Sequence, residues 1–192
     1  YAAVQKLTIT IEGNGSVSRN PAFDSYPKGS VVTLTATPDA GWKFLGWGGA
    51  ASGTATSRNI VMDADKTVIA RFAAIPVFQV TTSVEGSGSV DPAGGSFADG
   101  STVVFQAKPN AGWVFAGWKC ALTGNQNPAS LQVTASANVV ASFAQLPSIT
   151  RAPADASVDT GGSVVLSAEA SGTGPLSYQW NFNGSPIAGA NQ

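Results

Sequence analysis

Apolar and polar residues alternate in short segments along this chain. In the segment 7–11, for example, leucine and isoleucine alternate with threonine. Side chains of a β-strand point alternately to the two faces of a sheet, so this period of two predicts strands with one buried and one solvated face. No segment has a convincing apolar period of 3.6 residues, and glycine-rich turns separate the alternating segments. The pattern therefore predicts an all-β protein with little or no helix.

Two stretches of the chain are repeated further along it. "GNGSV" (Gly13–Val17) returns as "GSGSV" (Gly86–Val90), and "DAGWKFLGWGGA" (Asp39–Ala50) returns as "NAGWVFAGWKCA" (Asn110–Ala121). From Gly29 onward the two copies keep one spacing, and the alternating segments match between them. Repetition at a fixed period indicates tandem modules, so we expect two copies of one small β module. We interpret each glycine-rich stretch as a hairpin turn, because glycine adopts positive φ freely.

Two short junctions that contain proline divide the chain. They are "AAIPVF" (Ala73–Phe78) and "AQLPS" (Ala144–Ser148). Short linkers with proline restrict swivelling, so they favour a semi-rigid string of modules. We therefore expect three parts, which cover residues 1–74, 75–145 and 146–192.

The spaced positions of Leu7–Phe72 begin with the pattern "L.I...G.GSV...P....Y..G..V.L.A.P..G..F.GW.G", and Phe78–Phe143 match it nearly as well. This pattern resembles the divergent internalin-type B-repeat, a module strung in tandem in bacterial surface and secreted proteins. The resemblance implies small, β-rich modules of the β-grasp-like type. It also implies a role as spacer, adhesive stalk or accessory of a secreted enzyme, and it brings no catalytic residues.

The pattern changes after the second junction. Two strand-like stretches, "SVVLSAEA" (Ser163–Ala170) and "LSYQWNFNG" (Leu176–Gly184), resemble the first half of an immunoglobulin-like domain. Trp180 stands where such domains place their core tryptophan, and Ala168 stands where a disulfide-bonded member carries cysteine. The resemblance implies a partial immunoglobulin-like β-sandwich. Half a sandwich exposes strand edges, so we expect it to be completed by further sequence or by a strand from a neighbouring subunit.

Composition excludes several classes of function. Charged residues make up 11% of the chain and the net charge is −1, so we expect no nucleic-acid partner. No run of about 18 apolar residues exists, which predicts no membrane insertion. The chain has no histidine, its acidic residues are scattered, and its single cysteine, Cys120, is expected to be small and partly buried. We expect no catalytic residues, no metal and no cofactor.

The repeated aromatic residues are the remaining candidates for a site. Strict alternation places Trp42 and Phe44 on one face of a strand and Trp47 on the other. We expect Trp47 and Trp118 nearer the surface, where they either contact a neighbouring module or bind a sugar ring. The aromatic residues expected to hold the fold together are Trp42, Phe44, Phe72, Trp113, Phe115, Phe143 and Trp180. The glycines and aromatics persist in both copies while the polar positions between them change, which favours packing over ligand binding.

These features favour a non-catalytic structural or adhesive segment of a bacterial exported protein. We expect it outside the cell or on its surface, as a stalk, a spacer or a filament subunit whose partners are other modules or subunits. The alternative is a pair of carbohydrate-binding accessory modules of a secreted polysaccharide-degrading enzyme, with a polysaccharide as partner.

Overall fold

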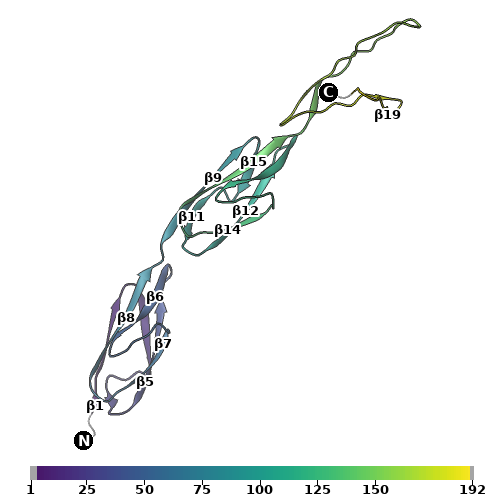
Figure 1. Cartoon of the computed structure of the whole chain (residues 1–192). Coiled ribbons are helices and arrows are strands. Elements are labelled where there is room, and N and C mark those ends of the chain that lie inside the picture. Colours follow the sequence, from purple (N-terminus) through teal and green to yellow (C-terminus); the bar gives the residue numbers. More distant parts are fainter. Residues whose placement is uncertain (1–3, 191–192) are drawn as a thin grey trace. The chain divides into compact units, whose positions relative to one another are not determined.

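The computed structural model describes residues 4–190 as strands and turns, without a helix in that range. The all-β class expected from the alternating pattern is confirmed. The chain divides into two compact units, and the boundary lies between Val77 and Phe78 (Figure 1). Below, the first module is residues 4–76, the second module is residues 77–146, and the C-terminal segment is residues 147–190.

The first module contains two three-stranded sheets and one short additional strand pair. Its strands are β1 (Val4–Gln5), β2 (Leu7–Glu12), β3 (Gly15–Asn20), β4 (Tyr26–Pro27), β5 (Val31–Pro38), β6 (Trp42–Gly49), β7 (Ser57–Val61) and β8 (Lys66–Ala74). The strand orders are β2-β8-β6 and β3-β5-β7, and β1 pairs with β4. Strands β2 and β8 are parallel, whereas the other pairs of the module are antiparallel.

The core of the first module lies between these two sheets. In β5, Val32, Leu34 and Ala36 are buried, and in β8, Val68 and Ala70 are fully buried. These side chains belong to one apolar cluster to which both sheets contribute. The polar residues between them lie on the outer faces, which are wholly or partly solvated. The period of two in the sequence thus gives each of these strands one buried face and one face that is exposed or partly exposed to solvent.

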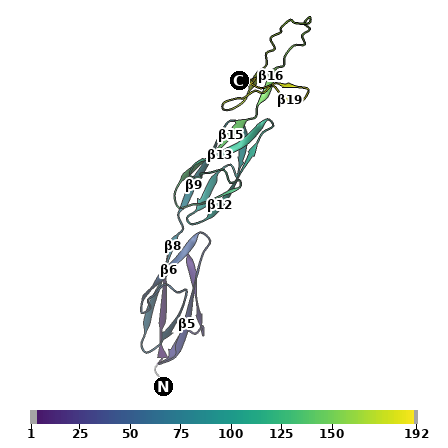
Figure 2. The same cartoon turned by 45° about the vertical axis from the view of Figure 1, so that its right-hand side comes forward.

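The second module repeats this arrangement. Its strands are β9 (Val77–Glu85), β10 (Gly88–Asp91), β11 (Gly95–Ala98), β12 (Thr102–Pro109), β13 (Trp113–Cys120), β14 (Ala129–Gln132) and β15 (Ala137–Gln145). The strand orders are β11-β9-β15-β13 and β10-β12-β14, with β9 and β15 parallel. Strands β9, β12, β13 and β15 of this module are labelled in Figure 2. A second, separate apolar cluster fills the space between the sheets. The first copy has two more residues than the second between its glycine-rich stretch and Gly29, and β3 is correspondingly longer than β10.

The glycine-rich stretches are not the hairpin turns that we expected. Strands β2 and β3 belong to different sheets, so the turn between them is a corner that carries the chain from one sheet to the other. Gly13 has φ of +88°, and a Cβ there would collide with the carbonyl oxygen of Phe72. Gly86 has the same φ, and a Cβ there would lie 2.5 Å from the carbonyl oxygen of Phe143. Glycine is needed at this corner for both its backbone conformation and its lack of a side chain.

The C-terminal segment contains little regular structure. It has two short antiparallel pairs, β16 (Ser148–Arg151) with β17 (Glu169–Ser171) and β18 (Asn181–Phe182) with β19 (Ser185–Pro186). The strand expected over Ser163–Ala170 forms only from Glu169 onward. Residues 164–166 are apolar but exposed, because no second sheet faces them within the described residues. The immunoglobulin-like sandwich stays a prediction.

Candidate functional site

The repeated tryptophan stretch forms an edge strand in each module. In β6, Phe44 lies opposite Phe72 of β8, but the next pair joins Gly46 to Arg71. Leu45 is therefore the extra residue of a β-bulge. The bulge resets the alternation of side chains, so Phe44 and Trp47 lie on the same face, with ring centroids 5.1 Å apart. Strand β13 has the same bulge, between Phe115 and Gly117.

This bulge corrects the expected placement of the tryptophans. Trp47 is only 5% exposed and Trp118 only 4%, so both rings lie in the module cores. Trp42 and Trp113, which strict alternation placed inside, are half-buried and pack against the same cores. The expectation was wrong because it counted residues without the bulge. Leu45 faces outward instead and is 48% exposed.

Each buried indole also fastens the loop that follows its strand. The Nε1–H of Trp47 donates to the carbonyl of Ala55 at 2.8 Å, and its backbone N–H donates to the carbonyl of Gly53 at 2.9 Å. Trp118 makes the corresponding bonds to Gln126 at 2.9 Å and to Gly124 at 2.8 Å. These bonds satisfy the only polar atom of a buried indole ring. The tryptophan therefore joins core and loop, and it presents no flat face to a ligand.

The other aromatic residues of the repeat complete the same cores. Phe72 and Phe143 are buried, and Phe44 and Phe115 are half-buried. The ring centroids of Phe44 and Phe72 lie 5.4 Å apart, and those of Phe115 and Phe143 lie 6.0 Å apart. Tilted and edge contacts at such distances are favourable between aromatic rings.

One buried aromatic residue was missed by the sequence reasoning. Tyr26 is fully buried, and its hydroxyl donates to the carbonyl of Pro21 at 2.8 Å. It also accepts a bond from the backbone N–H of Phe23 at 3.3 Å. Tyr26 thus holds the longer connection of the first module. The only sequence signal was the recurrence of an aromatic residue here, because Phe97 takes the equivalent place before the glycine turn.

An ion pair at the end of the parallel strands is kept in both modules, although its cation changes position. Glu12 pairs with Arg71 of β8 at 2.8 Å. In the second module Ser142 replaces Arg71, and Glu85 pairs instead with Lys119 of β13. Lys119 stands where the first module has Gly48, and a Cβ on Gly48 would collide with the Arg71 guanidinium. The two substitutions compensate one another.

These ion pairs are exposed, and two carboxyl groups respond to their lysine partners. The hydrogen bond from Lys119 lowers the pKa of Glu85 below its usual value. Lys66 lowers the pKa of Asp63 in the same way, chiefly through a side-chain hydrogen bond. Both groups lie on the surface, so solvent screens the pairs.

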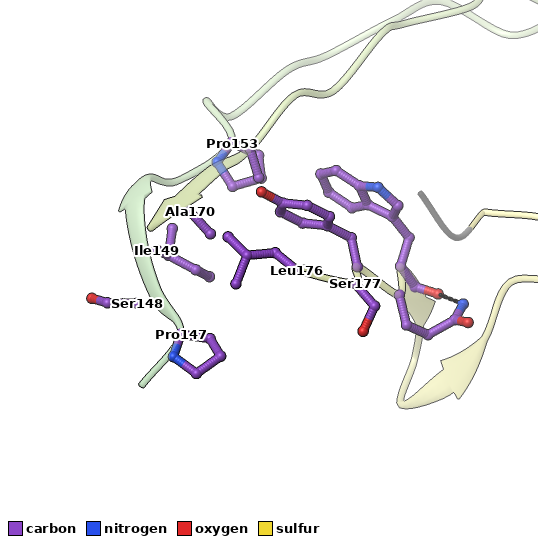
Figure 3. A pocket seen from close by; sticks show the side chains of 11 residues that line it. Pro147, Ser148, Ile149, Pro153, Ala170, Leu176 and Ser177 are labelled. Carbon is purple, nitrogen blue, oxygen red and sulfur yellow. Dashed lines mark hydrogen bonds between the residues drawn. The ribbon is translucent and has the colours of Figure 1, made fainter. Parts of the chain in front are cut away.

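A mostly apolar hollow lies in the C-terminal segment. It has a volume of about 330 Å³, and residues of β16, of β17 and of the segment 176–180 line it; Figure 3 labels several of them. Its apolar lining includes Ile149, Ala170, Leu176 and Tyr178. Trp180 is half-buried at this hollow rather than enclosed in a core.

The described residues include no cluster of metal-ligating side chains, and their one cysteine is exposed. Between residues 4 and 190, no three histidine, cysteine or acidic side chains gather to hold a metal ion. Cys120, the last residue of β13, is exposed, not partly buried as expected, and it has φ of +69°. In this same range no helix has the length and apolar character to cross a membrane.

Comparison with known proteins agrees with this structure of two similar modules. The divergent InlB B-repeat domain matches residues 5–76 and again residues 78–147, which is more than half of the chain. Domains of this kind are non-catalytic modules and occur in bacterial surface proteins. Among curated proteins no significant match is found. The chain belongs to the divergent InlB B-repeat family.

Proposed function

We propose that this chain is a spacer or adhesive stalk in a bacterial exported protein, placed outside the cell or on its surface. The observation that supports this role is the use of the repeated side chains. Both copies of the aromatic motif are taken up by the module cores and by the loops that the indoles fasten. The motif therefore stabilises the fold of two similar modules, and a spacer needs such stably folded repeated modules.

The carbohydrate-binding alternative depended on exposed rings of Trp47 and Trp118. Stacking on a sugar ring requires an exposed, flat aromatic face, whereas Trp47 and Trp118 are at least nine-tenths buried. No specific observation in the described residues now favours a polysaccharide as the partner of either module.

The spacer role is tested by the length that a module adds. A third copy of residues 77–146 is inserted after residue 146, and the maximum dimension is measured by small-angle X-ray scattering. We expect this dimension to grow by about the length of one module. The control is an insert of the same number of glycine and serine residues, whose length grows only with about the square root of that number. An unchanged dimension with the extra module would contradict the spacer role.

We also propose that the C-terminal segment associates with a further β-strand. Its hollow is lined mainly by apolar side chains, and Ile149 at its edge is 66% exposed. Among the strands of residues 4–190, β16 pairs with β17 alone, so its other edge has no strand partner there and leaves N–H and C=O groups unpaired. An added strand would cover both the hollow and this edge, and its source would be a neighbouring subunit or a further part of the same protein.

This second proposal is tested by sedimentation at increasing protein concentration. If subunits complete one another, the average mass rises with concentration, and Ile149→Asp prevents the rise because it places a charge at the apolar hollow. Val31→Asp is the control, since Val31 is also half-exposed but lies on the first module. If the wild-type chain remains monomeric at all concentrations, the added strand does not come from a neighbouring subunit, and a further part of the same protein is then its source. If Ile149→Asp and Val31→Asp weaken association equally, the hollow is not the association surface.

A further inference from the structure

The first long strand and the last strand of each module are hydrogen-bonded neighbours. In the first module, β2 runs parallel to β8 over six residue pairs, from Leu7 opposite Lys66 to Glu12 opposite Arg71. In the second module, β9 runs parallel to β15 over six pairs, which end with Glu85 opposite Ser142. The strands through which the chain enters and leaves each module are therefore joined directly.

The direction of these strands decides how a module responds to tension. Because β2 and β8 are parallel, the chain enters the pair at the Leu7 end and leaves it at the opposite end, beyond Arg71. A pull on both ends of the chain then acts along the strands and loads all the hydrogen bonds of the pair at once. An antiparallel hairpin, by contrast, is pulled at one end and opens one bond after another.

Several contacts reinforce the parallel pair. Val68 and Ala70 of β8 are fully buried, so sliding of β8 would expose the core. At the exit end, the Glu12–Arg71 ion pair bridges the last residue pair. Just beyond it, the backbone N–H of Ile75 donates to the carbonyl of Gly41 at 2.8 Å.

The second module keeps this reinforcement with different side chains. Glu85 is bridged by Lys119 of β13 instead of by a residue of β15. The backbone N–H of Leu146 donates to the carbonyl of Gly112 at 2.8 Å, as Ile75 does to Gly41 in the first module. The same exit contacts thus accompany the parallel pair in both copies.

We propose that each B-repeat module is a load-bearing element, in which the parallel pair of terminal strands resists tension along the chain by shear. This inference rests on the spacer role proposed above and adds a mechanical function to it. The C-terminal segment provides an internal contrast. Strands β16 and β17 are antiparallel, share only a few residue pairs and have no buried core, so this segment yields before either module.

The test is single-molecule force spectroscopy of the whole chain, held at its two ends and carrying Cys120→Ser. We expect two unfolding events at high force, one for each module, after the C-terminal segment has extended at low force. Each event lengthens the chain by roughly 200 Å, since an extended residue spans about 3.3–3.6 Å. Two events at low force, or a gradual extension without distinct events, would overturn the proposal.

The direction of pulling is the most direct control. Val31 and Val61 lie opposite each other at one end of the antiparallel pair β5–β7, and both side chains are half-exposed. Handles attached through Val31→Cys and Val61→Cys, again with Cys120→Ser, pull on the same folded module but open its hydrogen bonds in sequence. We expect an unfolding force at least about two-fold lower than in end-to-end pulling. Equal forces in the two directions would show that the parallel pair carries no special load.

A pair of substitutions separates the strand pair from the core. Thr10→Pro places a residue without a backbone N–H in the middle of β2, whereas Ile60→Ala removes buried volume from β7. We expect Thr10→Pro to lower the unfolding force much more than Ile60→Ala does, relative to the loss of equilibrium stability of each variant. If the force simply follows equilibrium stability in both variants, the core and not the strand pair bears the load.

The force measurement and the scattering test of the spacer role can fail separately. Force measurements use the purified chain and do not depend on where the protein resides or whether an added module lengthens it. A failed scattering test would remove the spacer role and leave the measured resistance in place. Weak modules that still lengthen the chain would leave the spacer role and remove the load-bearing function.

Discussion

At the scale of single residues, the buried tryptophan of each repeat, Trp47 or Trp118, both fills the core and binds the loop that follows its strand. The ring of Trp47 fills the core, and its Nε1–H holds the carbonyl of Ala55. A hydrogen bond of this kind stabilises a folded protein by about 1 kcal/mol net. The loop after β6 is therefore coupled to the core through one side chain.

Trp47→Phe tests this coupling. The variant keeps an aromatic ring in the core but loses the indole N–H, so we expect a loss of about 1–2 kcal/mol in the free energy of unfolding. Urea unfolding measures this loss, and hydrogen exchange should rise in the loop 50–56. Trp42→Phe, in the half-buried tryptophan of the same strand, is the control and should leave the exchange of that loop unchanged.

The Glu85–Lys119 pair predicts a dependence of stability on pH. Because the folded state lowers the pKa of Glu85, the pair stabilises the second module above the ordinary glutamate pKa of about 4.5, and this contribution is lost as pH falls through the lower, folded-state pKa. We expect Lys119→Ala to reduce the loss of stability between about pH 5 and pH 3, measured by thermal unfolding. Lys43→Ala, on the first module, should leave this pH-dependent loss of stability unchanged.

At the scale of elements, the alternating pattern predicts most strands of the two modules but not the positions of all their side chains. Val32, Leu34 and Ala36 are buried as expected, because β5 is regular. In β6 the same rule fails after Phe44, since one inserted residue moves every later side chain to the other face. A bulge depends on pairing with a distant strand, so local alternation contains no sign of it.

A further one-residue shift in β6 should damage the first module severely. Insertion of one residue between Gly46 and Trp47 turns Trp47 away from the core, so the module loses a large buried side chain, a change that costs about 3–5 kcal/mol. The expected result is an unfolded or strongly destabilised first module in urea denaturation. Leu45→Ala removes only an exposed side chain and should change stability by less than about 1 kcal/mol. A stable insertion variant would show that the register of β6 does not set the position of Trp47.

The C-terminal segment shows the other limit of sequence patterns. Residues 164–166 have strand-like composition, but they remain exposed and form no strand. A strand needs a neighbour to pair with and a surface to pack on. Composition describes the capacity to form a strand, whereas the partner decides whether it forms.

At the scale of the whole molecule, the repeats and the family were accessible from the sequence, because spacing and glycine positions recur twice. The candidate site was not, since the buried state of Trp47 depends on the bulge. The two modules have separate apolar cores, one around Met62 and one around Val133. Separate cores imply that each module has its own unfolding equilibrium.

Substitutions at matching core positions test this independence. Met62 is fully buried, and Val133, 1% exposed, takes the equivalent place in the second module. Met62→Ala should destabilise the first module by about 2–5 kcal/mol and leave hydrogen exchange in the second module unchanged. Val133→Ala should do the reverse with a smaller loss. Increased exchange in both modules after either substitution would show that they unfold as one.

The positively charged partner of the glutamate lies on a different strand in each copy, and this difference has a consequence for the gene. Tandem repeats recombine, and a crossover between the Gly48 and Arg71 positions would join one half of each copy. One hybrid would carry glycine and serine, and leave its glutamate without a cation. The other would carry both lysine and arginine beside one glutamate. Each copy is thus a matched set of one glutamate and one cation, which recombination within this stretch does not preserve.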